Sequence, residues 1–323
     1  MIVTKTPLRL PLAGGLTDLK SYAHQHGGVT VSMAIDKHVY VIIKDSVDGF
    51  FDLRYTDVHE KVLDHSEIKN DLIREALIVA GLSEHPVHLV VMTDLAGESG
   101  LGTSGAVCVG LLNAMFSLKG KQKSQQELLE AAAHIEVEVL EGASGYHDPS
   151  ICALGDIQHI IYDTNGIQAQ PVVLSDDIRA RFQDSLLFFY GGHHAKSKPS
   201  LNLLESHLDK GLDHLHQIKA IGLELKPALI AGDIQRVGEI LGEQQRLKMT
   251  LPGKFTDDYV KDIVGKVRDL GAYAQLPGGK ISAFVVVCCP DGQQDAVRTL
   301  MVAEGHQEIG FAIERNGTSA VSI

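Results

Sequence analysis

The sequence predicts an α+β fold, and three observations lead to that prediction. Hydrophobic residues make up 44% of the 323 residues, enough to bury a sizeable core in one large or two closely packed domains. Runs typical of β-strands gather in the first half of the chain, whereas helical periodicities dominate the second half. The elements come in blocks rather than in the strict β-α-β alternation of a doubly wound sheet, and this order favours α+β.

In the first half, residues 29–44 contain two β-type runs on either side of Asp36 and Lys37. We expect further strands at 50–55, 88–92 and 157–162, and helices at 71–80, 103–118 and 125–140, followed by a break at 142–145.

In the second half, we expect a strand at 185–190, helices at 200–218, 226–231, 234–248 and 256–270, and a last unit with a strand at 281–288, a helix at 293–304 and short strands near 309 and 321. No repeat, low-complexity segment or linker-like composition marks a boundary, so a division into domains would fall within residues 163–184.

Composition and charge exclude several classes of protein. No apolar run approaches the roughly 20 residues of a membrane span, and the N-terminus lacks the layout of a signal peptide, so we expect a soluble, cytoplasmic protein without a membrane partner. The formal net charge of −12 argues against a nucleic-acid surface. The four cysteines form no C-x-x-C pair, so we expect reduced core residues. The oligomeric state is left open, a homodimer included.

The most informative segment is DLAGESGLGTSGAVCVGLLNAMFS, residues 94–117. Its loop of small residues runs into an apolar helix, so backbone N–H groups and a helix N-terminus can face one anion, as in a phosphate-binding loop. The loop also satisfies G-x-G-x-x-G, but neither the long loop after the preceding strand nor the helical segment near residue 120 fits a dinucleotide site. No Gly-Lys-Ser/Thr completes a P-loop. A glycine-rich loop that only lets a helix pack closely is the structural alternative.

Two hydroxyl residues, Thr103 and Ser104, stand in the first turn of this predicted helix. A hydroxyl beside bound phosphates can ligate Mg²⁺, a hard cation that prefers oxygen donors. Helix capping is the alternative explanation for both hydroxyls.

A second group of residues lies near the N-terminus, where Arg9 stands in the apolar run LRLPLAGG. A buried guanidinium needs an anionic partner, which an internal ion pair or a bound substrate could supply. Asp18 follows the glycine turn AGGLTD and precedes a helical segment, LKSYAHQH. It is expected either to cap that helix or to present a carboxylate to sugar hydroxyls.

A third group lies in EVEVLEGASGYHDPSICALG, residues 136–155. Asp148 precedes Pro149 and is expected to start a helix, either as a cap or as the carboxylate that takes or orients the proton of an attacking hydroxyl. Glu136 and Glu138 are two positions apart on one predicted helix, so at most one of them is expected to point at the glycine loop. His147 is expected to be a packed or hydrogen-bonding neighbour rather than a base.

Three segments in this order, TPLRLPLAGGLTDLKSY with GGVTVSMAIDKHVYV, then ESGLGTSGAV, then GYHDPSICALGDIQHI, resemble the galactokinase, homoserine kinase, mevalonate kinase and phosphomevalonate kinase (GHMP kinase) superfamily. The opening and the segment GEQQRLKMTLPGKFTDDYVKDI, with its E-x-x-x-L-K helix, resemble most the D-glycero-D-manno-heptose 7-phosphate kinase branch. The likeness covers nearly the whole chain and is most specific in its first two motifs.

The resemblance implies a two-domain fold, with a ribosomal-protein-S5-like domain at 1–175 and a ferredoxin-like domain at 176–323, and with ATP and a sugar meeting in the cleft between them. It implies a kinase that uses ATP and Mg²⁺ on a hydroxyl of a sugar or sugar phosphate, such as the anomeric hydroxyl of a heptose 7-phosphate. Asp148 would be the catalytic carboxylate, and Arg9 would steady either this carboxylate or the transferring phosphoryl group. Ser104 and Glu136 would ligate Mg²⁺. The predicted contacts to the nucleotide are Gly97, Ser99, Gly100, Leu101, Gly102, Thr103, Ser104 and Gly105. Those to the acceptor are Gly15, Thr17, Asp18, His147 and Lys196.

The chain departs from the family pattern mildly at Thr103 and Gly105, where serine and alanine are usual, and more strongly in two other places. At 276–283 it reads LPGGKISA, where Pro277, Lys280 and Ile281 would narrow a loop that normally lets backbone approach the site. Lys280 would donate to a phosphate or be a solvated turn residue. Residues 191–198, GGHHAKSK, replace a threonine and an arginine of the branch and could bind a sugar phosphate. The altered loop leaves open a catalytically silent sugar and nucleotide sensor on the same fold, and a decarboxylating relative is the less favoured third alternative.

Overall fold

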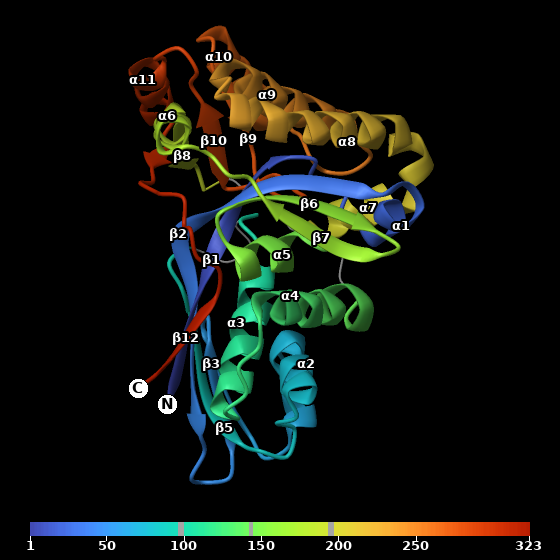
Figure 1. Cartoon of the computed structure of the whole chain (residues 1–323), viewed down its shortest axis with the longest axis vertical. Helices are drawn as coiled ribbons and strands as arrows, with labels where there is room; N and C mark the ends of the chain where they lie inside the picture. Colours follow the sequence, from blue (N-terminus) through green and yellow to red (C-terminus); the bar gives the residue numbers. More distant parts are fainter. Residues whose placement is uncertain (96–99, 142–144, 193–196) are drawn as a thin grey trace.

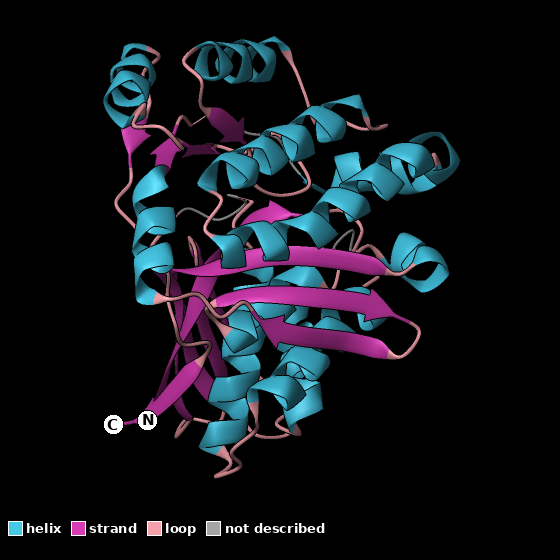
Figure 2. Ribbon diagram, turned by 45° about the horizontal axis from the view of Figure 1, so that its top comes forward, coloured by secondary structure: helices cyan, strands magenta, loops and turns pink. Residues whose placement is uncertain are grey.

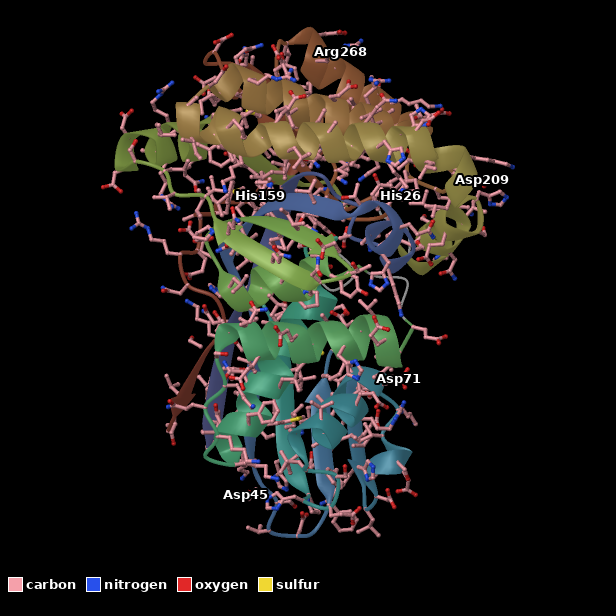
Figure 3. All side chains as sticks on the ribbon, turned by 45° about the vertical axis from the view of Figure 1, so that its right-hand side comes forward. His26, Asp45, Asp71, His159, Asp209 and Arg268 are labelled. Atoms are coloured by element: carbon pink, nitrogen blue, oxygen red, sulfur yellow. The ribbon has the colours of Figure 1, made fainter. Side chains whose placement is uncertain are left out.

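The computed structural model describes residues 1–323 except 96–99, 142–144 and 193–196. In the described part of the chain, the strands form one eight-stranded and one four-stranded sheet, in two units stacked along the long axis (Figure 1). Figure 3 labels Asp45 of the first unit at one end of the molecule and Arg268 of the second unit at the other. The α+β prediction is confirmed.

The first sheet has the order β12-β1-β2-β5-β3-β4, with β6 on another part of β2 and β7 beside β6. Its strands are β1 (Ile2–Ala13), β2 (Gly28–Asp45), β3 (Phe51–Tyr55), β4 (Val58–Val62), β5 (Val87–Thr93), β6 (Ile157–Asp163), β7 (Gly166–Pro171) and β12 (Ser319–Ser322). The two β-type runs predicted around Asp36 and Lys37 are one continuous strand, β2. Its first half pairs with β6 and its second half with β5, so the sheet changes direction along β2 (Figure 2).

The sequence did not predict β1, a strand of 12 residues that pairs with both β12 and β2. Pro7 and Pro11 interrupt the strand signal, and almost all of the strand from Thr6 on is buried, so it shows no polar and apolar alternation. The pairing with β2 shifts register at both prolines, which lets the strand continue past residues that cannot donate a ladder hydrogen bond.

The helices of the first unit are α1 (Lys20–His26), α2 (Asp71–Ala80), α3 (Thr103–Leu118), α4 (Gln125–Ala133) and α5 (His147–Leu154). The predicted bounds of α2 and α3 are confirmed to the residue. Asn70 caps α2 by accepting from the Ile73 amide at 3.1 Å, and Gly81 ends it with φ +69°. The α-helix predicted at 125–140 is shorter than expected, because α4 ends at Ala133. The chain then forms a π-helical turn, His134–Val139. Such turns often mark functional sites because they re-aim side chains.

The second sheet has the order β11-β8-β10-β9, with strands β8 (Leu186–Tyr190), β9 (Tyr273–Gln275), β10 (Phe284–Cys288) and β11 (Gln307–Glu308). Its helices are α6 (Asp176–Ser185), α7 (Ser197–Ser206), α8 (Leu208–Ala231), α9 (Ile234–Thr250), α10 (Asp258–Asp269) and α11 (Gln294–Ala303). The helices predicted at 200–218 and 226–231 are divided differently. The break falls at His207, and α8 continues through Pro227 to Ala231.

Helix α8 packs on β1 and β2 and α9 packs on β1, whereas α3 and α5 pack on the other side of these strands (Figure 1). The last strand, β12, returns to pair with β1, so the two termini lie side by side. The second half of the chain therefore contributes a strand to the first sheet, and the division at 175/176 stays a prediction. The four cysteines are buried free thiols. Among the described residues, no helix is both long and apolar enough for a membrane crossing.

Candidate active site

A cavity of about 520 Å³ lies where the two units meet. It is lined by β1 and the turn after it, by α3, the π-helical turn and α5, and by α9 with the turn after β9. The predicted site residues that line it are Arg9, Gly15, Asp18, Gly100, Ser104, Glu136, His147 and Asp148. Residues that are far apart in the sequence thus line the same cavity. Gly97, Ser99 and Lys196 lie outside the described residues.

The centre of the cavity wall is an ion pair between Arg9 and Asp148. The Arg9 guanidinium donates to Asp148 Oδ1 from Nε at 2.9 Å and from Nη2 at 2.5 Å. Its Nη1 donates to the carbonyl of Gly100, and the Arg9 backbone N–H donates to the Leu101 carbonyl at 2.9 Å. Arg9 is 4% exposed, and Asp148 is the anionic partner that the sequence analysis expected for a buried guanidinium. One side chain therefore ties the glycine loop to the candidate catalytic carboxylate.

The glycines let the loop approach this pair closely. Gly102 is the N-cap of α3 with φ +75°, and a Cβ there would lie 2.8 Å from Arg9 Cγ. A Cβ at Gly105 would lie 2.6 Å from the Asp148 carbonyl carbon. No described side chain caps α3, and Thr103 is its first helical residue rather than its cap. Close packing of the glycine loop is therefore observed, and the binding of phosphates at the start of α3, where Ser104 lines the cavity, stays a prediction.

Ser104 and Glu136 meet across the cavity wall, where the Ser104 hydroxyl donates to Glu136 Oε1. Glu136 is buried, and its Oε2 has no hydrogen-bond partner among the described residues. Burial raises the pKa of Glu136 to about 8, the Ser104 hydrogen bond lowers it, and Asp148 raises it further. Glu138 points elsewhere and contacts Lys20 and Tyr146.

This oxygen pair fits a divalent cation. A hydroxyl and a buried carboxylate oxygen without a partner are the donors that Mg²⁺ prefers, and a cation would remove the cost of ionising Glu136 in an apolar setting. Of the two glutamates left open by the sequence, Glu136 is the one beside the glycine loop.

Asp18 and His147 form the wall beside the glycine turn that follows β1. Asp18 accepts from the Leu16 amide at 3.1 Å and from the His147 amide at 3.2 Å. Burial, followed by the nearby Asp148, raises the pKa of Asp18 to about 6. Leu19 is the N-cap of α1 and no described side chain caps that helix, so the capping alternative for Asp18 is wrong.

His147 is buried, and its Nε2 has no partner among the described residues. Burial, followed by the charge of Arg9, lowers the pKa of His147 to about 3, so the ring is neutral near pH 7 and a weak base. Its Nδ1 lies 3.6 Å from Asp148 Oδ1.

Thr17, predicted to contact the acceptor, is fully buried and does not line the cavity. Its hydroxyl lies 2.7 Å from the Gly14 carbonyl and 2.9 Å from the Val29 carbonyl, so it holds the turn together. In the turn after β1, Gly15 lines the cavity instead, and an added Cβ there would meet nothing within 4 Å.

Known proteins share this fold and its motifs. Residues 68–156, which run from before α2 through the glycine loop to the end of α5, match the model of the GHMP kinases N terminal domain. The chain is 24% identical to a D-glycero-alpha-D-manno-heptose 7-phosphate kinase of Campylobacter jejuni, over 97% of each chain. The chain is therefore similar to GHMP kinases, by the family model over residues 68–156 and by this relative over nearly its whole length.

Two solved structures share the fold over nearly the whole chain. A D-glycero-D-manno-heptose 1-phosphate kinase from Bacteroides thetaiotaomicron matches with a TM-score of 0.83 and 21% identity, covering 100% of this chain and 99% of its own. A phosphomevalonate kinase of Streptococcus pneumoniae, solved with phosphomevalonate and AMPPNP, matches with a TM-score of 0.77 and 16% identity, covering 97% and 99%.

The 276–283 loop, which departs from the family pattern, packs on the glycine loop and leaves the cavity open. Gly278 has φ +80°, and a Cβ there would lie 2.8 Å from Gly100 Cα. Leu276, Gly278 and Gly279 line the cavity. Lys280 is 1% exposed, so its description as a solvated turn residue is wrong.

Sequence reasoning missed two site residues of α9, Gln244 and Lys248. Gln244 Oε1 accepts from the Gly14 amide at 2.9 Å, and Lys248 Nζ donates to the carbonyls of Leu276 and Gly278. The available signal was the E-x-x-x-L-K segment, whose final lysine is Lys248, because a lysine that faces the core at the end of an amphipathic helix is unusual.

Proposed function

We propose that this chain is an ATP- and Mg²⁺-dependent kinase that transfers the γ-phosphoryl group to a hydroxyl of a sugar or sugar phosphate. The anomeric hydroxyl of a heptose 7-phosphate is the first candidate acceptor. The observation that carries the proposal is the contact of Arg9 with both the Gly100 carbonyl and the Asp148 carboxylate. The named relatives, two of them heptose phosphate kinases, support a sugar kinase.

Phosphoryl transfer depends mostly on positioning and on neutralising charge. Asp148 would accept or orient the proton of the acceptor hydroxyl, because it lies at the cavity wall with part of its carboxylate accessible. Arg9 would hold that carboxylate in place and offer positive charge beside the transferring group. The first turn of α3 would bind the phosphates of the nucleotide through its amides.

Ser104 and Glu136 would hold Mg²⁺, which neutralises phosphate charge when it is bound. Asp18 would accept hydrogen bonds from sugar hydroxyls, and the Nε2 atom of neutral His147 would face the same part of the cavity. These roles account for every buried polar group of the cavity that lacks a protein partner among the described residues.

A coupled ADP-release assay with ATP and Mg²⁺ tests the proposal. The acceptor panel is a free heptose, its 7-phosphate and its 1-phosphate, with mevalonate as a non-sugar control. We expect turnover with at least one sugar or sugar phosphate and none with mevalonate, and ³¹P NMR of the product would identify the phosphorylated hydroxyl. Absence of ADP release with every sugar, while nucleotide still binds, would favour the sensor alternative and overturn the proposal.

A further inference from the structure

Lys248 is a buried lysine whose charge the proposed chemistry does not use. It lies in the last turn of α9 and is 3% exposed. Its Nζ donates to the carbonyl of Leu276 at 2.6 Å and to that of Gly278 at 2.9 Å. Among the described residues, no carboxylate lies within 4.0 Å of this ammonium. Burying a cation with only carbonyl groups as partners costs free energy. A lysine held in such a position is therefore a candidate for a functional role.

The turn held by Lys248 presses on the glycine loop. The closest approach is between Gly278 and Gly100, where a Cβ on Gly278 would lie 2.8 Å from Gly100 Cα, and one on Gly100 would lie 2.6 Å from the Pro277 carbonyl oxygen. The carbonyl of Gly100 in turn accepts from Arg9. A continuous series of contacts therefore runs from Lys248 through the 276–278 turn and Gly100 to the Arg9–Asp148 pair.

The residue next to Gln244 on α9 strengthens this arrangement. Gln245 Oε1 accepts from the Leu276 amide at 3.0 Å, so α9 holds Leu276 at both its amide and its carbonyl. Displacing the turn would therefore break contacts with two side chains of one rigid helix.

We propose that Lys248 is a positioning residue, which fixes the 276–278 turn against the glycine loop and thereby sets where the nucleotide phosphates lie relative to Arg9 and Asp148. The inference rests on the proposed kinase function and adds to it a residue outside the three sequence motifs. A misplacement of reacting groups by about 1 Å can cost about 100-fold in rate, so the effect of losing this contact is measurable.

The test compares Lys248→Met, which removes the charge and both hydrogen bonds, with Lys248→Gln, which keeps an N–H donor. Lys219→Met is the matched control, because Lys219 Nζ also donates to a backbone carbonyl, that of His26, but lies outside the cavity. We expect kcat/KM for ATP to fall about 10- to 100-fold in the Met variant and less in the Gln variant. The KM for the acceptor should change little, and the control should match the wild type.

Hydrogen exchange of the 276–283 peptide provides a readout that does not need turnover. Exchange should become faster in Lys248→Met and stay unchanged in Lys219→Met. If Lys248→Met fails to fold, hydrogen exchange and kcat/KM for ATP are compared between Lys248→Gln and the wild type, and this comparison tests the inference. Unchanged exchange, or faster exchange with kcat/KM for ATP within twofold of the wild type, would overturn the inference. A wild-type protein without kinase activity would overturn the proposed function instead, while exchange would still test the contact.

The pH profile separates positioning by charge from simple packing. Burial, followed by the charge of Arg9, lowers the pKa of Lys248 to about 7, so the ammonium is present below that pH and lost above it. The other charged or titratable side chains that line this cavity are Arg9, Asp18, Asp71, Glu136, His147 and Asp148, and Lys280 lies two residues beyond the turn. The wild type should therefore lose kcat/KM for ATP as the pH rises through about 7, and Lys248→Met should lack this component.

Discussion

The two walls of the cavity hold their polar side chains in different ways. On the wall from β1, α3 and α5, side chains pair with side chains, Arg9 with Asp148 and Ser104 with Glu136. On the wall from α9, Gln244 and Lys248 contact backbone groups of the facing turns. Pairs of side chains set charge and proton affinity, whereas contacts to backbone set where a loop lies. We therefore expect substitutions on the first wall to stop the chemistry and those on the second to shift binding and alignment.

The largest expected effect is that of Asp148→Asn, which keeps the shape of the side chain and removes its charge. Turnover should fall about 10²- to 10⁴-fold, because the hydroxyl proton loses its acceptor. Nucleotide binding measured by calorimetry should persist. The matched control is Asp156→Asn, since Asp156 also pairs with an arginine, Arg179, but outside the cavity. Equal turnover in the two variants would remove Asp148 from the mechanism.

The next effect is that of Glu136→Gln, which tests the oxygen pair. The Mg²⁺ concentration for half-maximal activity should rise about 10- to 100-fold, because the neutral amide no longer attracts the cation. Glu138→Gln is the control on the same helical turn, since this side chain contacts Lys20 and Tyr146. A Mg²⁺ titration that is the same for both variants would contradict the assignment of Glu136.

A smaller effect is expected for Gly102→Ala, which tests whether the close approach of the glycine loop to Arg9 is needed for activity. The added Cβ would lie 2.8 Å from Arg9 Cγ in a backbone with φ +75°, so the free energy of unfolding should fall by about 1–3 kcal/mol and kcat about tenfold. Gly120→Ala has a similar φ of +66° and no atom within 4 Å. It should share the backbone strain and keep full kcat, as measured by denaturant unfolding and initial rates. Equal loss of kcat in both would show that strain alone matters.

The smallest effect is the pH dependence of acceptor binding through Asp18. The raised pKa of about 6 means that the carboxylate is ionised above that pH and protonated below it. The acceptor KM should therefore rise a few-fold as the pH falls from about 7 to 5, since hydrogen bonds to a charged group are the stronger ones. Asp18→Asn should raise the KM and remove its pH dependence. A wild-type KM that is flat over this range would exclude Asp18 as the ionised sugar contact.

Local signals were sufficient for much of the fold and for part of the site. The bounds of α2 and α3 follow from periodicity, the Asn70 cap and the glycine-rich loop, all of which act within a few residues. The placement of Asp148 in the first turn of α5 has the same origin, although Tyr146 is the N-cap of this helix and the capping alternative for Asp148 is wrong. The partners of Arg9 could not be predicted from residues alone, because Asp148 stands 139 positions further along the chain.

The sequence by itself determined the helices around the glycine loop, the α+β class and the identity of the residues that carry charge, because those features depend on neighbours in the chain. Only the tertiary structure decided that β1 passes through Pro7 and Pro11 as a strand, that a π-helical turn brings Glu136 rather than Glu138 to Ser104, and that Lys248 is buried. Each of these depends on contacts between distant segments, whose packing outweighs local propensity once the core has formed.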